Sequence, residues 1–119
     1  MSEQTITYHL TPCEVWHVQA SNSTYAPEAF AAEGFIHCTD GEQQVIDVGN
    51  RYYASDPRQY CVLVIRRDLV AAQVVYEDSE RIYPHIYGVL NNDAIVETRS
   101  LIRAADGRFL EIGDPFPDN

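Results

Sequence analysis

The six-residue apolar segment YCVLVI, from Tyr60 to Ile65, constrains the fold of this chain more than any other segment. It is too short for a helix in a protein core and rich in β-branched residues, so it predicts a β-strand. Because no polar residue interrupts it, both faces of this strand are expected to be buried. The rest of the chain is therefore expected to fold around this strand.

Shorter patterns on either side of this segment predict further strands and three helices. Residues of high β-propensity between turn residues predict the other strands, at 5–10, from Phe35, and at 72–77, 94–101 and 108–112. Helix-start residues and apolar spacings predict helices at 12–20, 27–33 and 42–53. Helices in the first half and strands in the second half indicate an α+β domain. Its antiparallel β-sheet is expected to carry the short helices at one side.

Local capping patterns mark the ends of the predicted helices. Thr11 with Glu14, and Thr39 with Glu42, have the spacing of a capping box. In that motif the threonine hydroxyl accepts a bond from a backbone N–H and the glutamate side chain bonds back to the cap residue. Gly34 is expected to end the second helix in the left-handed conformation.

Length and composition predict one domain. The chain has 119 residues, 45% of them hydrophobic, which is enough for a single core. That core is expected to span about residues 5–113, and residues 114–119 are expected to be flexible. No segment approaches the roughly 20 apolar residues of a membrane span, so no membrane contact is expected. The three cysteines, which include no C-x-x-C pair, favour a reducing, cytoplasmic location.

The charge balance restricts the partners of the chain. Eight basic and 18 acidic residues give a net charge of −10 at neutral pH. A field of this sign repels the phosphate backbone of nucleic acids, so DNA and RNA are not expected partners. A small anionic ligand is compatible with the same charge, because one arginine or one helix N-terminus creates a local positive field.

Three histidines in aromatic surroundings are the candidate functional residues. His9 lies on the polar face of the first strand, His37 ends the segment GFIH, and His85 follows Pro84 in a predicted loop. Residues at the ends of elements often line clefts, so these three side chains are expected to share one. His17 is excluded, because it lies in the middle of a predicted helix and is expected to face solvent.

Two other chemistries are compatible with these residues. Catalytic zinc takes three protein ligands, which makes a metal-dependent hydrolase one alternative. The histidines are spread from residue 9 to residue 85 without a local metal-binding spacing, so no metal is expected. Cys38 follows His37, but neighbours in a strand point to opposite faces, which places Cys38 in the core rather than in a catalytic pair.

Several motifs together resemble a known family. They are YHLT, EGFIHCT followed by EQ, NRYY, and PHIYGVL. The chain from Thr5 to about Leu101 resembles the small bacterial proteins grouped as domain of unknown function 952. That resemblance implies an ADP-ribosyltransferase-like fold, in which a split antiparallel β-sheet forms a cleft that binds NAD.

The resemblance also implies roles for particular residues. His9 corresponds to the residue that holds the ribose and nicotinamide of NAD, and His37 to a residue that packs near the nicotinamide. His85 lies in PHIYGVL, the last of these motifs along the chain, and is a third catalytic candidate. Glu77 is the nearest candidate for the acid that stabilises positive charge as the glycosidic bond breaks, with Glu97 as the alternative.

Three further residues are candidates for nucleotide binding. Arg51 suits a pyrophosphate, since a guanidinium pairs with two phosphate oxygens at once. Tyr83 and Tyr87 flank His85 and are expected to line a nucleotide pocket. The sequence leaves two main hypotheses for the function. The first is an enzyme that acts on NAD or a related nucleotide, with glycosyl-transfer or NAD-cleaving activity. The second is a non-catalytic module that binds a small ligand. No permanently bound cofactor is expected.

Overall fold

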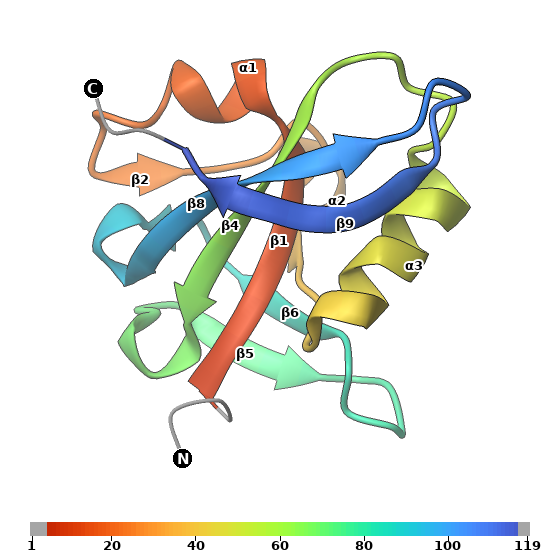
Figure 1. The fold of residues 1–119 in the computed structure, drawn as a ribbon. Coiled ribbons are helices and arrows are strands. Elements are labelled where there is room, and N and C mark those ends of the chain that lie inside the picture. The colour runs from red at the N-terminus through yellow and green to blue at the C-terminus, as the bar shows by residue number, and fades with distance from the viewer. Residues whose placement is uncertain (1–4, 117–119) are drawn as a thin grey trace.

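The computed structural model describes residues 5–116, which form three antiparallel β-sheets with short helices around them (Figure 1). The largest sheet has the order β1-β4-β8-β9, with strands Ile6–Pro12, Tyr60–Arg66, Ile95–Arg103 and Phe109–Pro115. A second sheet has the order β3-β6-β5, with strands Ile36–His37, Pro84–Tyr87 and Gln73–Tyr76. The third pairs β2, Thr24–Tyr25, with β7, Leu90–Asn91.

The helices are short. They are α1, Cys13–His17, α2, Phe30–Glu33, and α3, Glu42–Tyr52, with 3-10 turns at Arg67–Leu69 and Asn92–Ala94. The α+β class with antiparallel sheets and few short helices is therefore confirmed. No helix within residues 5–116 is long and apolar enough to cross a membrane.

Strand β4 is buried on both faces, as its uninterrupted apolar run predicts. Alternate side chains of a strand point to opposite faces, so β4 contributes to two separate cores. One core contains residues of β4 and α1, including Cys61, Leu63, Ile65 and Trp16. The other contains residues of β4, α3 and β9, including Tyr60, Val62, Val45, Ile46 and Phe109. The prediction that the helices lie at one side of the sheet is wrong, because both faces of β4 are apolar. Helix α1 packs in the core on one face and α3 in the core on the other.

Neither predicted threonine cap forms. Thr11 remains in β1 opposite Cys61, and α1 begins at Cys13 without a side-chain cap. Thr39 exchanges two backbone hydrogen bonds with Tyr8, of 2.8 and 2.9 Å, and Gly41 precedes α3 instead. Strand pairing fixes both threonines away from the helix ends. The predicted left-handed end of α2 is confirmed at Gly34, where φ is 81°.

Pairing between distant segments also corrects two predicted loops. His85 lies in β6 rather than in a loop, with β3 on one side and β5 on the other. The expected flexible tail is ordered at its start, because Asp114 and Pro115 belong to β9 and the Phe116 N–H donates to the Thr98 carbonyl at 2.8 Å. Residues 117–119 of that predicted tail lie outside the described residues.

The polar face of β1 is its buried face. Thr7, His9 and Thr11 are 0%, 5% and 1% exposed, because they share a face with the apolar core around Leu63 of β4. On the opposite face, Tyr8 and Leu10 are only partly buried and pack against the second core. The fold thus places a histidine in the interior, next to the bridge that joins β1 to Thr39.

Candidate functional site

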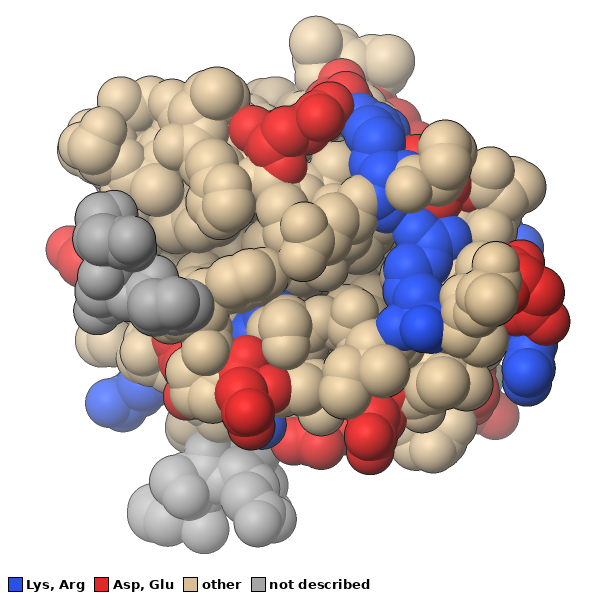
Figure 2. Space-filling view, turned by 45° about the horizontal axis from the view of Figure 1, so that its top comes forward, with Lys and Arg blue, Asp and Glu red and all other residues tan. Residues whose placement is uncertain are grey.

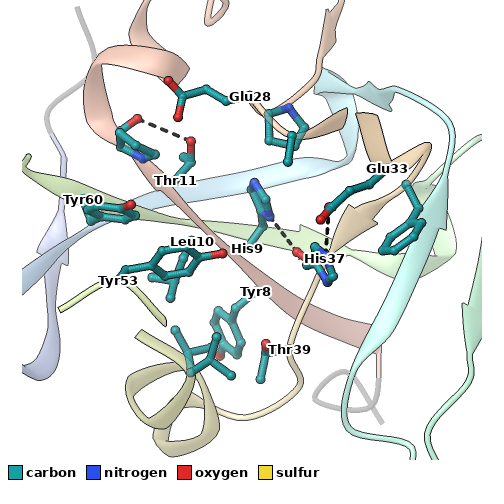
Figure 3. Close-up of a pocket in the computed structure, with 16 residues that line it drawn as sticks. Tyr8, His9, Leu10, Thr11, Glu28, Glu33, His37, Thr39, Tyr53 and Tyr60 are labelled. Carbon is teal, nitrogen blue, oxygen red and sulfur yellow. Dashed lines mark hydrogen bonds and ion pairs between the residues drawn. The ribbon is translucent and has the colours of Figure 1, made fainter. Parts of the chain in front are cut away.

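Two adjoining pockets form a cleft lined by residues of β1, α2, β3 and α3. The inner pocket has a volume of about 140 Å³ (Figure 3), and the outer pocket has a volume of about 620 Å³. They share the lining residues Ala29, Glu33, His37, Thr39, Val48 and Tyr53. A volume of several hundred Å³ is within the range of pockets that hold small molecules. The cleft is therefore large enough for a ligand of nucleotide size.

The two pockets differ in chemistry. Aromatic and aliphatic side chains dominate the inner pocket, and Figure 3 shows Tyr53 and Tyr60 on one side of His9, with Glu33 and His37 on the other. The side chains that line only the outer pocket are Cys38, Arg51, Tyr52, Tyr83 and His85. The inner part thus suits a ring, whereas the outer part offers a cation and two imidazoles.

Helix α3 forms one wall of the cleft and is held by β9. The Asn50 side chain bonds to both backbone groups of Phe109, donating to its carbonyl at 3.0 Å and accepting from its N–H at 2.7 Å. Gly49 lets the Phe109 ring approach the helix, since a Cβ at position 49 would lie 2.8 Å from that ring. This docking fixes the next turn, which carries Arg51 and Tyr53 into the cleft lining.

His9 is hydrogen-bonded at both ring nitrogens. Its Nδ1 lies 2.7 Å from the His37 carbonyl oxygen, which only accepts, so Nδ1 carries the proton and donates it. Its Nε2 lies 2.9 Å from the Tyr25 hydroxyl, which therefore donates to it. Burial lowers the pKa of His9 from 6.5 to about 4, so the ring is neutral at pH 7. His9 is thus fully bonded within the fold, and it holds the backbone of His37.

His37 and His85 are brought together by strand pairing. They lie opposite each other in β3 and β6, and their ring centroids are 5.1 Å apart. The Phe35 ring stacks on His85 at 4.3 Å and meets His37 edge-on at 4.8 Å. The predicted association of the three histidines therefore has a specific form: His9 bonds to the backbone of His37, whose ring faces His85.

Each of these two imidazoles is paired with a carboxylate. The Nε2 of His37 lies 3.0 Å from Glu33 Oε1, and the Nδ1 of His85 lies 2.8 Å from Glu77 Oε1. The Tyr87 hydroxyl also donates to Glu77 Oε1, at 2.7 Å. The bond from Tyr87, and then that from His85, lower the pKa of Glu77, so this carboxylate is ionised at neutral pH.

The other predicted site residues take separate positions. Arg51 and Tyr83 line the outer pocket, and among residues 5–116 Arg51 has no carboxylate partner. Tyr87 bonds to Glu77 rather than lining either pocket. Glu97 lies in β8 opposite Val64 and lines neither pocket. Of the two acidic candidates, Glu77 is the one next to the histidines.

Sequence reasoning missed Glu33 and Phe35. Phe35 had a usable signal, because residues two apart in a strand share a face, which places Phe35 with His37 in the predicted strand. Glu33 precedes His37 by four positions across the turn at Gly34, but that turn has no regular period to predict which way the carboxylate points.

The acidic groups around the inner pocket are partly neutralised. Glu28, in its lining, pairs with Arg58 at 3.0 Å, and the same arginine pairs with Asp56 at 2.8 Å. Bonds from Arg58 hold the pKa of Asp56 well below its usual range. Figure 2 shows a narrow band of basic side chains on one face of the molecule, with acidic side chains at its upper end. The pairing of Glu28 with Arg58 therefore reduces the negative charge beside the inner pocket.

The absence of a metal centre remains a prediction. No group of three or more His, Cys, Asp or Glu side chains within residues 5–116 is placed to hold a metal ion. Elemental analysis of the purified protein is expected to find no stoichiometric transition metal, in wild type and in His37→Ala alike. One zinc ion per chain in the wild type, lost in His37→Ala, would contradict this and favour a metal-dependent hydrolase.

Comparison with solved structures finds chains of similar fold. The crystal structure of protein CC0527 from Caulobacter crescentus has a TM-score of 0.75 to this chain, at 18% identity, and the match covers 89% of this chain and 94% of CC0527. The solution structure of CC0527 has a TM-score of 0.68 at 19% identity, with 87% and 90% covered. At this identity the likeness concerns the fold alone.

Sequence comparison adds the family. No curated protein matches the chain. The family model described as "Protein of unknown function (DUF952)" matches residues 10–98, a stretch that includes His37, Glu77 and His85. The family prediction is thereby confirmed, while its ADP-ribosyltransferase-like part stays a prediction. The chain belongs to the DUF952 family.

Proposed function

We propose that the cleft binds a two-part ligand of the NAD class, with a flat ring in the inner pocket and a phosphate group in the outer pocket. The proposal rests on a ring-sized pocket that adjoins a larger one. The larger pocket holds Arg51, which has no carboxylate partner among the described residues. The inner volume of about 140 Å³ is close to the roughly 150 Å³ of a protein cavity known to bind benzene.

The lining of the inner pocket supports a heteroaromatic ring. The tyrosines at positions 8, 53 and 60 provide ring faces and edges, and Glu33 lies in the same lining. Tyrosine rings and a carboxylate both attract cations, so these groups favour the positively charged nicotinamide ring of oxidised NAD. An adenine ring would be held by the stacking surfaces alone.

Arg51 supports a phosphate group in the outer pocket. A guanidinium without a carboxylate partner is free to pair with two phosphate oxygens. The resemblance of the chain to the DUF952 family, which implies an ADP-ribosyltransferase-like fold that binds NAD, supports the same ligand class. Because the net charge of −10 opposes a dianionic pyrophosphate, binding is expected to be weak.

A ligand-binding module without catalysis is the second candidate. The bonding of His9 favours this candidate. The family resemblance predicts that His9 contacts the ligand, but both of its ring nitrogens are bonded within the fold. In this function the inner pocket recognises a ring while no group performs chemistry on it. Turnover measurements separate the two candidates once binding is established.

Titration with NAD, followed by amide shifts in NMR spectra, tests the proposed function. Millimolar NAD is expected to shift amides of inner-pocket residues such as Tyr8 and of outer-pocket residues such as Arg51. Nicotinamide alone should shift the first group and AMP mainly the second. Arg51→Ala is expected to weaken NAD binding about two- to fivefold, the size of an exposed ion pair. Arg108→Ala, which removes an exposed arginine paired with Asp106, should leave binding unchanged.

Two results would refute the proposal. One is the absence of shifts at millimolar NAD, nicotinamide and AMP. The other is an equal loss of affinity in Arg51→Ala and Arg108→Ala, which would assign the binding to general charge rather than to the cleft.

A further inference from the structure

The carboxylates fix which nitrogen of each imidazole is free. Ionised Glu77 only accepts, so the Nδ1 of His85 carries a proton and the Nε2 of a neutral ring is unprotonated. By the same reasoning, Glu33 accepts from the Nε2 of His37 and leaves its Nδ1 as the free nitrogen. Neither free nitrogen has a protein partner among residues 5–116. A carboxylate that orients an imidazole in this way is a common device for proton transfer.

The two imidazoles differ in exposure, which suits different roles. The side chain of His85 is 19% exposed, and Phe35 covers one face of its ring. The side chain of His37 is 53% exposed and meets the His85 ring edge-on. The ring centroids are 5.1 Å apart, so both imidazoles can reach the same bound group. One protonated and one neutral imidazole form a general acid and a general base.

The position of this pair indicates which bond it acts on. His85 and Arg51 line the outer pocket but not the inner one, and His37 lines both. The other histidine of the inner pocket, His9, is fully bonded. The groups that transfer protons therefore lie beside the cation that would hold phosphate, rather than beside the ring.

We propose that the outer pocket hydrolyses a phosphoric anhydride or ester bond of the ligand, with His85 as base and His37 as acid. This rests on the proposed function, which places the phosphates there. A water oxygen bonds to phosphorus and gives its proton to His85 Nε2. The bond from phosphorus to the leaving oxygen breaks, the electron pair stays on that oxygen, and protonated His37 donates a proton to it. Arg51 neutralises charge on the non-bridging oxygens.

The overall step consumes one water and needs no other reactant. For NAD the products are AMP and nicotinamide mononucleotide. Proton exchange with solvent returns His85 to its neutral form and His37 to its protonated form. Glu77 is a positioning residue, which holds His85 in the tautomer with a free Nε2.

Product formation and the His85 tautomer can be measured in the same proteins. NAD and bis(4-nitrophenyl) phosphate are incubated with wild type, His85→Gln, Glu77→Gln and the control Glu80→Gln, an exposed glutamate of the next turn. Wild type is expected to yield AMP and nicotinamide mononucleotide. His85→Gln should lower kcat about 100-fold or more, the range of general base catalysis. Glu77→Gln should lower kcat with KM unchanged, and it should shift the NMR signals of the His85 ring nitrogens toward the other tautomer. Glu80→Gln should leave both kcat and these signals unchanged.

The outcomes separate this inference from the proposed function. Cleavage of NAD to ADP-ribose and nicotinamide, or NAD binding with no cleavage of either substrate, would overturn the inference and leave the proposed function standing. No NAD binding and no cleavage of either substrate would overturn both. Cleavage of bis(4-nitrophenyl) phosphate that depends on His85, without NAD binding, would support the acid–base pair and overturn the NAD class.

Discussion

Phe109→Ala is expected to lower the free energy of unfolding by about 3 to 5 kcal/mol, the range for removing a buried aromatic ring. The Phe109 side chain is 2% exposed, packs edge-on against Tyr60 at 5.6 Å, and lies under the Arg103 guanidinium at 4.3 Å. Its ring fills the space that Gly49 leaves on α3. Removing it creates a cavity between the sheet and the helix that walls the cleft. Urea unfolding monitored by circular dichroism measures the change.

Leu110→Ala is the matched control for this variant. Leu110 follows Phe109 in the same strand, but its side chain points to the other face and is 49% exposed. Its loss is expected to change the free energy of unfolding by less than about 0.5 kcal/mol. If Phe109→Ala costs less than about 1 kcal/mol, the docking of α3 on β9 is not the main support of the cleft wall.

Lowering the pH from 7 to 4 is expected to destabilise the wild type by up to about 3 kcal/mol through His9. Burial depresses the pKa of His9 from 6.5 to about 4, and each pKa unit corresponds to about 1.4 kcal/mol. Between these values the unfolded chain binds a proton that the folded protein does not, so stability falls as pH falls through this window. Urea unfolding at several pH values between 4 and 7 measures the slope.

Comparison with His9→Asn isolates this contribution from that of other groups. The asparagine amide retains a donor near the position of Nδ1, so the bond to the His37 carbonyl is kept while the titrating group is removed. The variant should lose the slope between pH 6.5 and 4. His17→Gln, which removes an exposed histidine, should keep it. A slope that is equal in wild type and His9→Asn would show that His9 is not the buried titrating group.

These two expectations concern the scaffold of the cleft rather than its chemistry. Phe109 holds α3, which carries Arg51, and His9 holds the backbone of His37. Phe109 lines neither pocket, whereas His9 lines the inner pocket with both ring nitrogens already bonded within the fold. The groups that we propose act on a ligand, Arg51, His37 and His85, line the outer pocket.

Several features follow from the sequence by itself, because they depend on local order. The run from Tyr60 to Ile65 forms a strand buried on both faces whichever strands lie beside it. Apolar spacing predicts α3, and a glycine suited to the left-handed conformation ends α2 at Gly34. The motifs YHLT, EGFIHCT, NRYY and PHIYGVL together predict the family, which the family model confirms.

The tertiary structure decided the features that depend on partners far along the chain. Thr11 and Thr39 have the local pattern of helix caps, but backbone pairing with β4 and with Tyr8 holds them in extended positions. His9 has the pattern of an exposed strand residue, but the core on that side of β4 buries it and makes it neutral. The contact between His37 and His85 arises because β3 and β6, nearly 50 residues apart, pair in one register. No local pattern specifies a register between distant strands, since it is fixed by the packing of all the strands together.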